Sequence, residues 1–288
     1  MTFAEFFAAN PIVLAVIVFV FGLIVGSFLN VVIYRLPLQL SSAWRRDAMD
    51  FLGMEAPEPH HINIVFPASH CPSCGEKVKP WQNIPLLSYL ILKGKCAYCA
   101  SPISIQYPLI EFICALMTAF VVYHFGLTFE GLLVLLFSWS LLALTGIDFN
   151  EQLLPDNITL PLLWLGLLVN LNNTFASLDS AVLGAVFGYL SLWWIFWLFK
   201  LLTGKEGMGH GDFKLLAALG AWLGWQQLLL IILLSSMVGA VVGILLIMFT
   251  GRDKQIPIPF GPYLAAAGWI AMMWGEELTN NYLSLFNY

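Results

Sequence analysis

Charged side chains are scarce in this chain of 288 residues. Asp, Glu, Lys and Arg together make up 10% of it, whereas hydrophobic residues make up 60%. Soluble domains usually contain about 25% charged residues, so the composition excludes an ordinary soluble protein. The mean hydropathy of +0.84 agrees. The sequence therefore predicts an all-α polytopic membrane protein.

Several signatures of other protein classes are also absent. The sequence has no basic stripe with interleaved aromatic residues, so we expect no nucleic-acid partner. It has no His-Glu-x-x-His motif, which argues against a zinc metalloprotease of the membrane. No strand followed by Gly-x-Gly and a helix marks a soluble nucleotide-binding fold. The first apolar run lacks a basic N-terminal region and an Ala-x-Ala-like cleavage site, so we interpret it as a retained helix rather than a signal peptide.

About eight transmembrane helices are expected, because roughly 20 apolar residues cross a bilayer. The candidate spans are Pro11–Tyr34, Pro108–Phe125, Gly131–Ile147, Ile158–Leu171, Ala181–Leu202, Phe213–Trp225, Leu228–Phe249 and Pro259–Trp274. Phe213–Trp225 is short for a span. We keep it because omitting it would place two basic residues on the wrong side of the membrane.

Positive charge is missing from every second connection between these spans. The 12 Lys and Arg residues lie between the first two spans, around the Gly-rich segment before Phe213, or, as Arg252 and Lys254, between the last two. The connections at 124–129, 170–180 and 226–227 contain none, nor does either tail. Because basic residues mark cytoplasmic loops, we expect both termini to lie outside and the Gly-rich segment to face the cytoplasm.

Four of the five cysteines lie in the hydrophilic insert between the first two spans. They form the pairs Cys71-Pro-Ser-Cys74 and Cys96-Ala-Tyr-Cys99, with 21 residues between the pairs. This spacing is typical of a tetrahedral zinc site, whose four thiolates leave no open position and so indicate a structural role. A redox dithiol pair is the main alternative. We expect three parts: a first helix (1–34), a zinc-binding insert (35–107) and a membrane core (108–288).

Two aspartates stand where apolar spans meet polar loops. Asp148 follows the apolar run that ends at Ile147, and Asp212 follows Gly209-His210-Gly211. A carboxylate in or near hydrocarbon costs several kcal/mol, roughly 2.5–3.5 on insertion scales, and is rarely kept without a task. If the two acids meet, one proton can be held between them. Such a pair is suited to hydrolysis of a peptide bond at a membrane surface.

Other interpretations of these acids are open from the residues alone. Asp148 is also typical of a helix cap or of a solvated acidic loop, since Glu151 and Asp156 follow it. We expect Asp156 to cap the next helix and Lys214 to favour the ionised form of Asp212. A proton-coupled transporter is the alternative function, with the aspartates as a proton relay. That function predicts acids near the midplane and an internal repeat, whereas these acids lie at span ends.

Taken together, six motifs in this order resemble one family, the bacterial type IV prepilin peptidases of the GxGD aspartic class. The matching segments, which extend over almost the whole chain, are Gly26–Pro37, the paired Cys-x-x-Cys insert, Pro80–Pro85, Gln106–Glu111, Ile147–Asp148 with Leu154–Asp156, and Glu206–Leu215.

The resemblance implies that Asp148 and Asp212 are the catalytic pair and that Cys71, Cys74, Cys96 and Cys99 hold structural zinc. It implies a multi-pass enzyme of the bacterial inner membrane with periplasmic termini and a cytoplasmic active site. Its substrates would be prepilins and pseudopilins with a short basic leader, which is cut after glycine. The new N-terminus, usually phenylalanine, would then be methylated with S-adenosylmethionine. Apart from membrane lipid and these substrates, the sequence indicates no partner and no oligomeric state.

Overall fold

The computed structural model describes residues 10–54, 63–250 and 259–284, and within these ranges the regular structure is helical. The only β-pairings there are two isolated bridges, both in the insert. The predicted all-α class is therefore confirmed. The residues His60, His61, Arg252 and Lys254 lie outside the described ranges. The chain divides into two compact units, Met1–Ala143 and Leu144–Tyr288.

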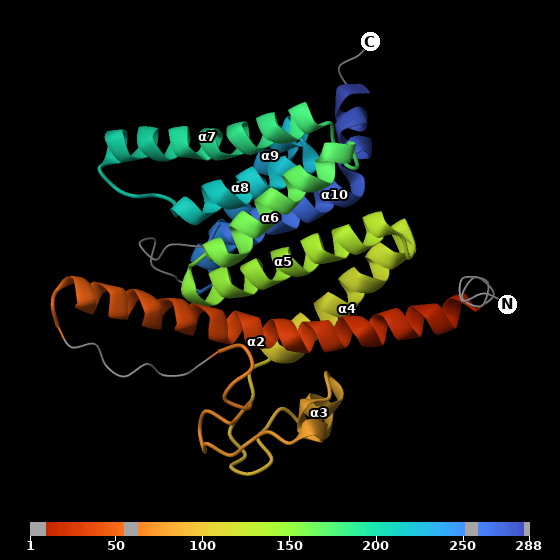
Figure 1. The fold of residues 1–288 in the computed structure, drawn as a ribbon, viewed down its shortest axis with the longest axis vertical. Helices are drawn as coiled ribbons and strands as arrows, with labels where there is room; N and C mark the ends of the chain where they lie inside the picture. The colour runs from red at the N-terminus through yellow and green to blue at the C-terminus, as the bar shows by residue number, and fades with distance from the viewer. Residues whose placement is uncertain (1–9, 55–62, 251–258, 285–288) are drawn as a thin grey trace. The chain divides into compact units, whose positions relative to one another are not determined.

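Each of the predicted spans corresponds to a helix. The long helices are α2 (Pro11–Phe51), α4 (Gln106–Phe125), α5 (Phe129–Glu151), α6 (Asp156–Val169), α7 (Leu178–Thr203), α8 (His210–Leu223), α9 (Leu228–Thr250) and α10 (Gly261–Ser284) (Figure 1). A short helix, α3 (Leu87–Ile91), lies in the insert, and single 3-10 turns occupy Pro80–Asn83, Asn170–Asn172 and Trp225–Gln227.

The protein is a membrane protein with several helices of spanning length. Within the described ranges five helical segments are long and apolar enough to cross a bilayer: α2, α4, α5, α7 and Trp225–Leu246, which contains most of α9. Helices α6 and α8 have 14 residues each, about 21 Å at 1.5 Å per residue. This is shorter than the hydrocarbon core of about 30 Å. The spans assigned to α6, α8 and α10 stay predictions.

In the first unit, α2 and α4 pack closely through small residues. A side-chain carbon added at Gly22 would lie 2.6 Å from the Cα of Ala115, and one added at Gly26 would lie 2.7 Å from the Cα of Glu111. Glycines four residues apart let two membrane helices approach at backbone distance. One turn further on, Asn30 Nδ2 donates a hydrogen bond to the carbonyl of Tyr107 at 3.0 Å.

Two buried side chains attach the insert to this helix pair. Arg35 is 7% exposed and donates to the carbonyls of Asn63 at 3.0 Å and Pro67 at 2.6 Å. Glu111 Oε2 accepts a hydrogen bond at 2.8 Å from the backbone N–H of Leu86. Buried charged groups need such partners. These contacts therefore fix the path of the insert on both sides of the first cysteine pair.

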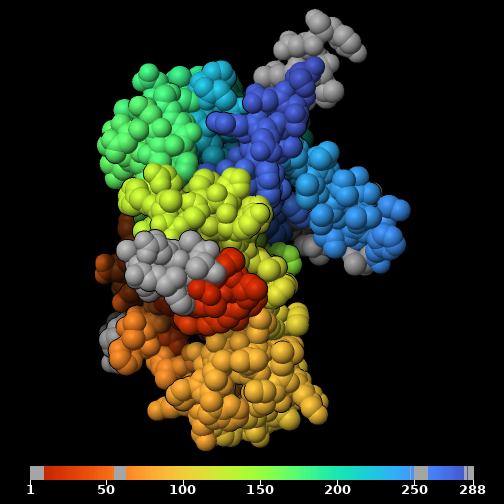
Figure 2. Space-filling model, turned by 90° about the vertical axis from the view of Figure 1, so that its right-hand side faces the viewer, coloured from red at the N-terminus to blue at the C-terminus, as the bar shows by residue number. Residues whose placement is uncertain are grey.

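In the second unit, α8 is the central helix, in contact with α6, α7 and α10 (Figure 1). Its residues from Phe213 to Trp222 are almost all buried, and Leu215, Leu216 and Leu219 are fully so. Helix α10 runs beside α9, which lies on the outside of this unit (Figure 2). An apolar helix buried on all sides needs no lipid-facing surface, and this explains how a helix of 14 residues holds its place.

Close backbone contacts and buried hydrogen bonds fix α8. A carbon added at Gly188 of α7 would lie 2.6 Å from the carbonyl oxygen of Leu216. At its far end, Asn170 Nδ2 donates to the carbonyls of Ala221 at 2.9 Å and Trp222 at 3.0 Å. Trp222 Nε1 donates to the Leu162 carbonyl of α6 at 2.8 Å. The first turn of α8, which carries Asp212, is therefore held on a rigid support.

Candidate functional site: two buried aspartates

Asp148 lies in the last turn of α5 and is 5% exposed. Its Oδ2 accepts a hydrogen bond at 3.0 Å from the backbone N–H of Gly261, the first residue of α10. The first N–H groups of a helix have no partner within the helix, and the helix N-terminus favours a negative charge. Asp148 is thus neither a solvated loop residue nor the cap of its own helix. It caps α10, which begins more than a hundred residues later in the chain.

Asp212 lies in the first turn of α8 and is 6% exposed. Gly209 precedes this helix as its N-terminal cap residue, and its carbonyl accepts a hydrogen bond from the backbone N–H of Asp212 at 3.2 Å. Gly211, in the Gly-x-Gly segment before Asp212, packs directly against Leu154. A side chain would not fit at this position, because an added side-chain carbon would lie 2.7 Å from the Leu154 Cβ.

The fold brings the two aspartates into the same part of the second unit. Leu154 lies beside both, since it contacts Gly211 next to Asp212 and also lies 3.1 Å from a carbon added at Gly261, the residue whose N–H donates to Asp148. The sharing of one proton between the two acids stays a prediction. Two buried carboxyls that lie close together repel each other when both are ionised, and one proton held between them would relieve this repulsion.

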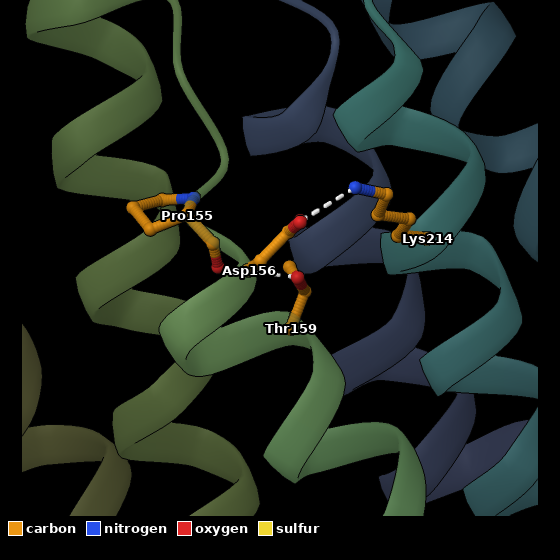
Figure 3. Close-up of polar contacts among 4 residues, drawn as sticks. All are labelled: Pro155, Asp156, Thr159 and Lys214. Carbon is orange, nitrogen blue, oxygen red and sulfur yellow. Dashed lines mark hydrogen bonds and ion pairs between the residues drawn. The ribbon is translucent and has the colours of Figure 1, made fainter. Parts of the chain in front are cut away.

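Lys214 does not face Asp212, contrary to our expectation. Its Nζ lies 2.7 Å from Asp156 Oδ1 and 2.8 Å from Oδ2 (Figure 3). The expected capping role of Asp156 is also wrong: Pro155 is the cap residue of α6, and no side-chain cap bond is formed. Asp156 is instead the first residue of α6, where its negative charge interacts favourably with the helix dipole. The ion pair links α6 to α8.

We expect this ion pair to contribute little to stability. Both side chains are partly exposed, at 30% for Lys214 and 51% for Asp156, and such pairs are worth about 0.2–1 kcal/mol. The variants Lys214→Gln and Asp156→Asn should each lower the unfolding free energy by less than about 1 kcal/mol. A double-mutant cycle on purified protein in detergent, with Lys205→Gln as the control, measures the coupling. A loss of all activity in both single variants would contradict a purely supporting role.

The four cysteines of the insert converge in the first unit. Their Sγ atoms all lie within 4.8 Å of one another, and those of Cys71 and Cys99 are 3.8 Å apart. Zn–S bonds of about 2.3 Å in a tetrahedron place sulfurs roughly 3.8 Å apart. One cluster of four thiols fits a single metal ion better than two separate redox dithiols. The described part of the chain thus contains a cysteine site that can hold a metal ion.

Local backbone structure prepares this cluster for metal binding. Each cysteine pair lies in a tight loop, with Gly75 and Ala100 at positive φ of 74° and 57°. The backbone N–H groups of Cys74 and Ser73, with the Ser101 hydroxyl, lower the pKa of Cys71 to about 6. The Ser101 side chain also lowers the pKa of Cys99, from a distance of 3.0 Å. Lower thiol pKa values favour the thiolates that bind metals.

Gly261 is the residue of the aspartate site that the sequence reasoning missed. It follows Pro259-Phe260 and precedes Pro262, and proline after glycine at the start of an apolar run indicates a helix N-terminus. That signal locates the start of α10 but not its contact with Asp148. A carbon added at Gly261 would lie 2.6 Å from Asp148 Oδ2.

We expect Gly261→Ala to displace the Asp148 carboxyl and to lower peptidase activity by roughly ten- to a hundredfold. Measurement of kcat/KM on purified enzyme tests this. Ala266→Gly is the control, because it changes one methyl group at an exposed position of the same helix. An active Gly261→Ala enzyme would show that the contact has no influence on the reaction.

Two family models match the chain. The bacterial peptidase A24 N-terminal domain matches residues 20–125, and the type IV leader peptidase family matches residues 135–244. A prepilin leader peptidase/N-methyltransferase of Pseudomonas aeruginosa is 53% identical over the whole of both chains. Proteins of the same name from Stutzerimonas stutzeri, 52% identical over 98% of each chain, and Legionella pneumophila, 46% identical over 95% and 96%, are also similar. No solved structure matches the chain.

Proposed function

The chain belongs to the type IV leader peptidase family and acts as a prepilin leader peptidase and N-methyltransferase, and we propose that Asp148 and Asp212 are its catalytic pair. One observation carries the assignment of the residues. Two buried acids from distant parts of the chain lie at helix ends that meet at Leu154. A fold rarely buries two carboxyls together without a function for them.

The proposed mechanism uses one shared proton. The ionised Asp148 takes a proton from a water molecule while the oxygen of that water attacks the scissile carbonyl carbon. Asp212, protonated, donates to the carbonyl oxygen as negative charge develops there. The surroundings support this order: both carboxyls lie at a helix N-terminus, and the Asp148 carboxyl in addition accepts a hydrogen bond from the backbone N–H of Gly261. Gly209, where an added side-chain carbon would meet no atom closer than 3.8 Å, leaves room beside the pair for an extended peptide backbone.

The proposed site faces the cytoplasm of the bacterial inner membrane, and both termini are periplasmic. Lys200 in the last turn of α7, Lys205 in the loop that follows and Lys214 near the start of α8 support this orientation, since they flank Asp212 along the chain. Basic residues mark the cytoplasmic side. A prepilin leader that has not crossed the membrane would meet the site there.

Of the acidic side chains near the site, only some can attract the positive charge of a basic leader. Glu151 is exposed and free to attract positive charge over about a Debye length, ~8 Å at physiological salt. Glu206, however, accepts a hydrogen bond from Lys200 at 2.8 Å. This bond and the Lys200 charge lower the pKa of Glu206. Its charge is therefore largely matched by Lys200 and contributes little to leader binding.

The insert at 35–107 is proposed as a structural zinc domain between the first helix, 1–34, and the peptidase core, 108–288. Zinc would be held by Cys71, Cys74, Cys96 and Cys99 and would supply folding energy rather than chemistry. S-adenosylmethionine would supply the methyl group for the new N-terminus. The transporter alternative has no support, because both matching family models describe peptidases.

One experiment tests the proposed function. The purified full-length chain, reconstituted in lipid, is incubated with a prepilin and S-adenosylmethionine that carries an isotope-labelled methyl group. Mass spectrometry of the mature N-terminus should show removal of the leader and gain of one labelled methyl group. Intact prepilin after incubation with well-folded enzyme would overturn the proposal.

A further inference from the structure

The short helix α3 of the insert turns its apolar side chains outward. Leu87, Leu90 and Ile91 are spaced i, i+3 and i+4, which places them on one face of the helix, and they are 57%, 68% and 69% exposed. Ser88 and Tyr89, on the other side, are only partly exposed. A helix at a protein surface in water has the reverse arrangement, with its polar residues outward. The exposed face of α3 therefore indicates an apolar medium.

A hydrogen bond places the start of α3 at the depth of the membrane-spanning helices. Leu86 directly precedes α3, and its backbone N–H donates to Glu111 Oε2 of α4 at 2.8 Å. Helix α4 has 20 residues and is therefore about 30 Å long, as thick as the hydrocarbon core of a bilayer. Glu111 follows the first residue of α4, Gln106, by five positions. It lies about 7 Å inside the end of the span, and so does the N–H of Leu86.

Helix α2 indicates the same boundary of the membrane. About 20 residues cross a bilayer, and counted from Pro11 they extend to Asn30. Asn30 Nδ2 donates to the carbonyl of Tyr107, the second residue of α4. Gly26, one turn before Asn30, packs against Glu111. Both helices therefore place Glu111, and the start of α3 with it, on the membrane side of this boundary.

The insert around α3 is basic. Its described residues from 63 to 105 include one acid, Glu76, and four lysines, Lys77, Lys79, Lys93 and Lys95, and all five side chains are exposed. Lys93 and Lys95 closely follow the end of α3. Lysines beside an apolar helix face attract the anionic headgroups of lipids. The charge, the apolar face and the depth of α3 together fit an anionic bilayer surface.

We propose that α3 anchors the insert in the bilayer surface. Leu87, Leu90 and Ile91 lie among the acyl chains, and Lys93 and Lys95 bind anionic headgroups. Because α3 lies between the two cysteine pairs in the chain, the anchor holds the cysteine cluster against the membrane. The anchor does not depend on the aspartate pair, so its tests need no cleavage of a substrate.

A photoreactive side chain tests the contact with lipid. A benzophenone amino acid replaces Leu90 in the full-length chain, which is purified, placed in nanodiscs of phosphatidylcholine and phosphatidylglycerol, and irradiated. The matched control has the same replacement at Val65, which is 71% exposed and lies in the loop that accepts hydrogen bonds from Arg35. Arg35 follows Gly26 by nine positions, about 13 Å along α2, so Val65 lies farther from the bilayer than the start of α3.

Mass spectrometry should show lipid adducts at position 90 roughly tenfold more often than at position 65, because apolar helix faces enter the bilayer surface by only about 5–10 Å. In nanodiscs of phosphatidylcholine alone, the adducts at position 90 should decrease severalfold, because the lysines lose their anionic partners. An unchanged yield there would overturn the headgroup contact. Adducts at position 90 to protein alone, or equal lipid adducts at both positions, would overturn the anchor.

Hydrogen exchange covers the case in which the photoreactive variant does not fold. In the same mixed nanodiscs, Leu90→Asp should raise the exchange rate of the α3 amide groups by roughly tenfold, because a carboxylate does not stay among acyl chains. Val65→Asp is the control and should leave α3 exchange at the wild-type rate. Equal exchange in wild type and Leu90→Asp would overturn the anchor, since a position exposed to water tolerates such a change.

Discussion

Asparagine in place of either aspartate should reduce prepilin cleavage by at least about a thousandfold, within the range for loss of a general acid or base. The amide has the shape of the carboxyl but can neither take a proton from water nor give one to the scissile carbonyl. Asp148→Asn keeps an oxygen that can accept the hydrogen bond from Gly261. The start of α10 should therefore stay in place, and the loss should be chemical rather than structural. Initial cleavage rates with purified enzyme and full-length prepilin measure it.

The matched control is Asp179→Asn, which changes an exposed acid in the first turn of α7, as Asp212 lies in the first turn of α8. It should cut prepilin at the wild-type rate. All three variants should insert into membranes and elute from size exclusion as wild type does. Methylation of a pilin that has already been cut should continue in both asparagine variants, because methyl transfer does not require the acid pair. Near-normal cleavage by either variant would remove that aspartate from the mechanism.

The sequence indicated the Asp212 position more clearly than the Asp148 position. Gly209, Gly211 and the following apolar run place Asp212 at a helix start by local rules. Asp148 has an acidic, polar neighbourhood along the chain, so local reasoning also fits a solvated loop. Its burial depends on Gly261 and Leu154, which are brought to it by tertiary packing. A hydrogen bond across such a separation has no local signature.

The errors at Lys214 and Asp156 have a common physical cause. Residues two apart on a helix point in different directions, whereas those three or four apart are neighbours. Once α8 begins before Asp212, Lys214 is turned away from it and can reach another helix. Pro155 precedes Asp156 and takes the cap position, so α6 begins at Asp156 itself. A shift of one residue at a helix start is enough to convert a cap into an ion-pair partner.

Hydropathy located the long helices but not their lengths. The first apolar run ends at Tyr34, whereas α2 continues to Phe51. The added turns are rich in good helix formers such as Leu, Ala, Arg and Met, and the chain leaves the helix before Gly53, at a φ of 64°. The length of an apolar run reflects the thickness of the bilayer. The helix propensity of the residues that follow determines where the helix ends. Helix α8 shows the reverse case, in which packing alone supports a short apolar helix.

Removal of the four clustered thiols of the insert should have the second large effect. Purified wild type should contain one zinc per chain, and a variant with Ser at positions 71, 74, 96 and 99 should contain none. Structural zinc sites supply on the order of 10–16 kcal/mol of apparent binding energy at neutral pH. The insert has few buried apolar residues, since its described part from 63 to 105 is mostly exposed. We therefore expect the fold of the insert to depend on the metal, and the insert of the variant should be unfolded.

Limited proteolysis measures this loss directly, because an unfolded insert is cut between the first two long helices while the rest of the chain stays protected. Cleavage and methylation assays on the same sample show which activity needs the insert. Cys114→Ser is the matched control: Cys114 is fully buried in α4, away from the cluster, so this variant should retain its zinc. Wild type without zinc, combined with a fully active and protease-resistant quadruple variant, would rule out a metal site. Zinc loss with cleavage intact and methylation lost would instead assign the insert to methyl transfer, because the aspartate pair lies wholly within the second unit and the cysteine cluster within the first.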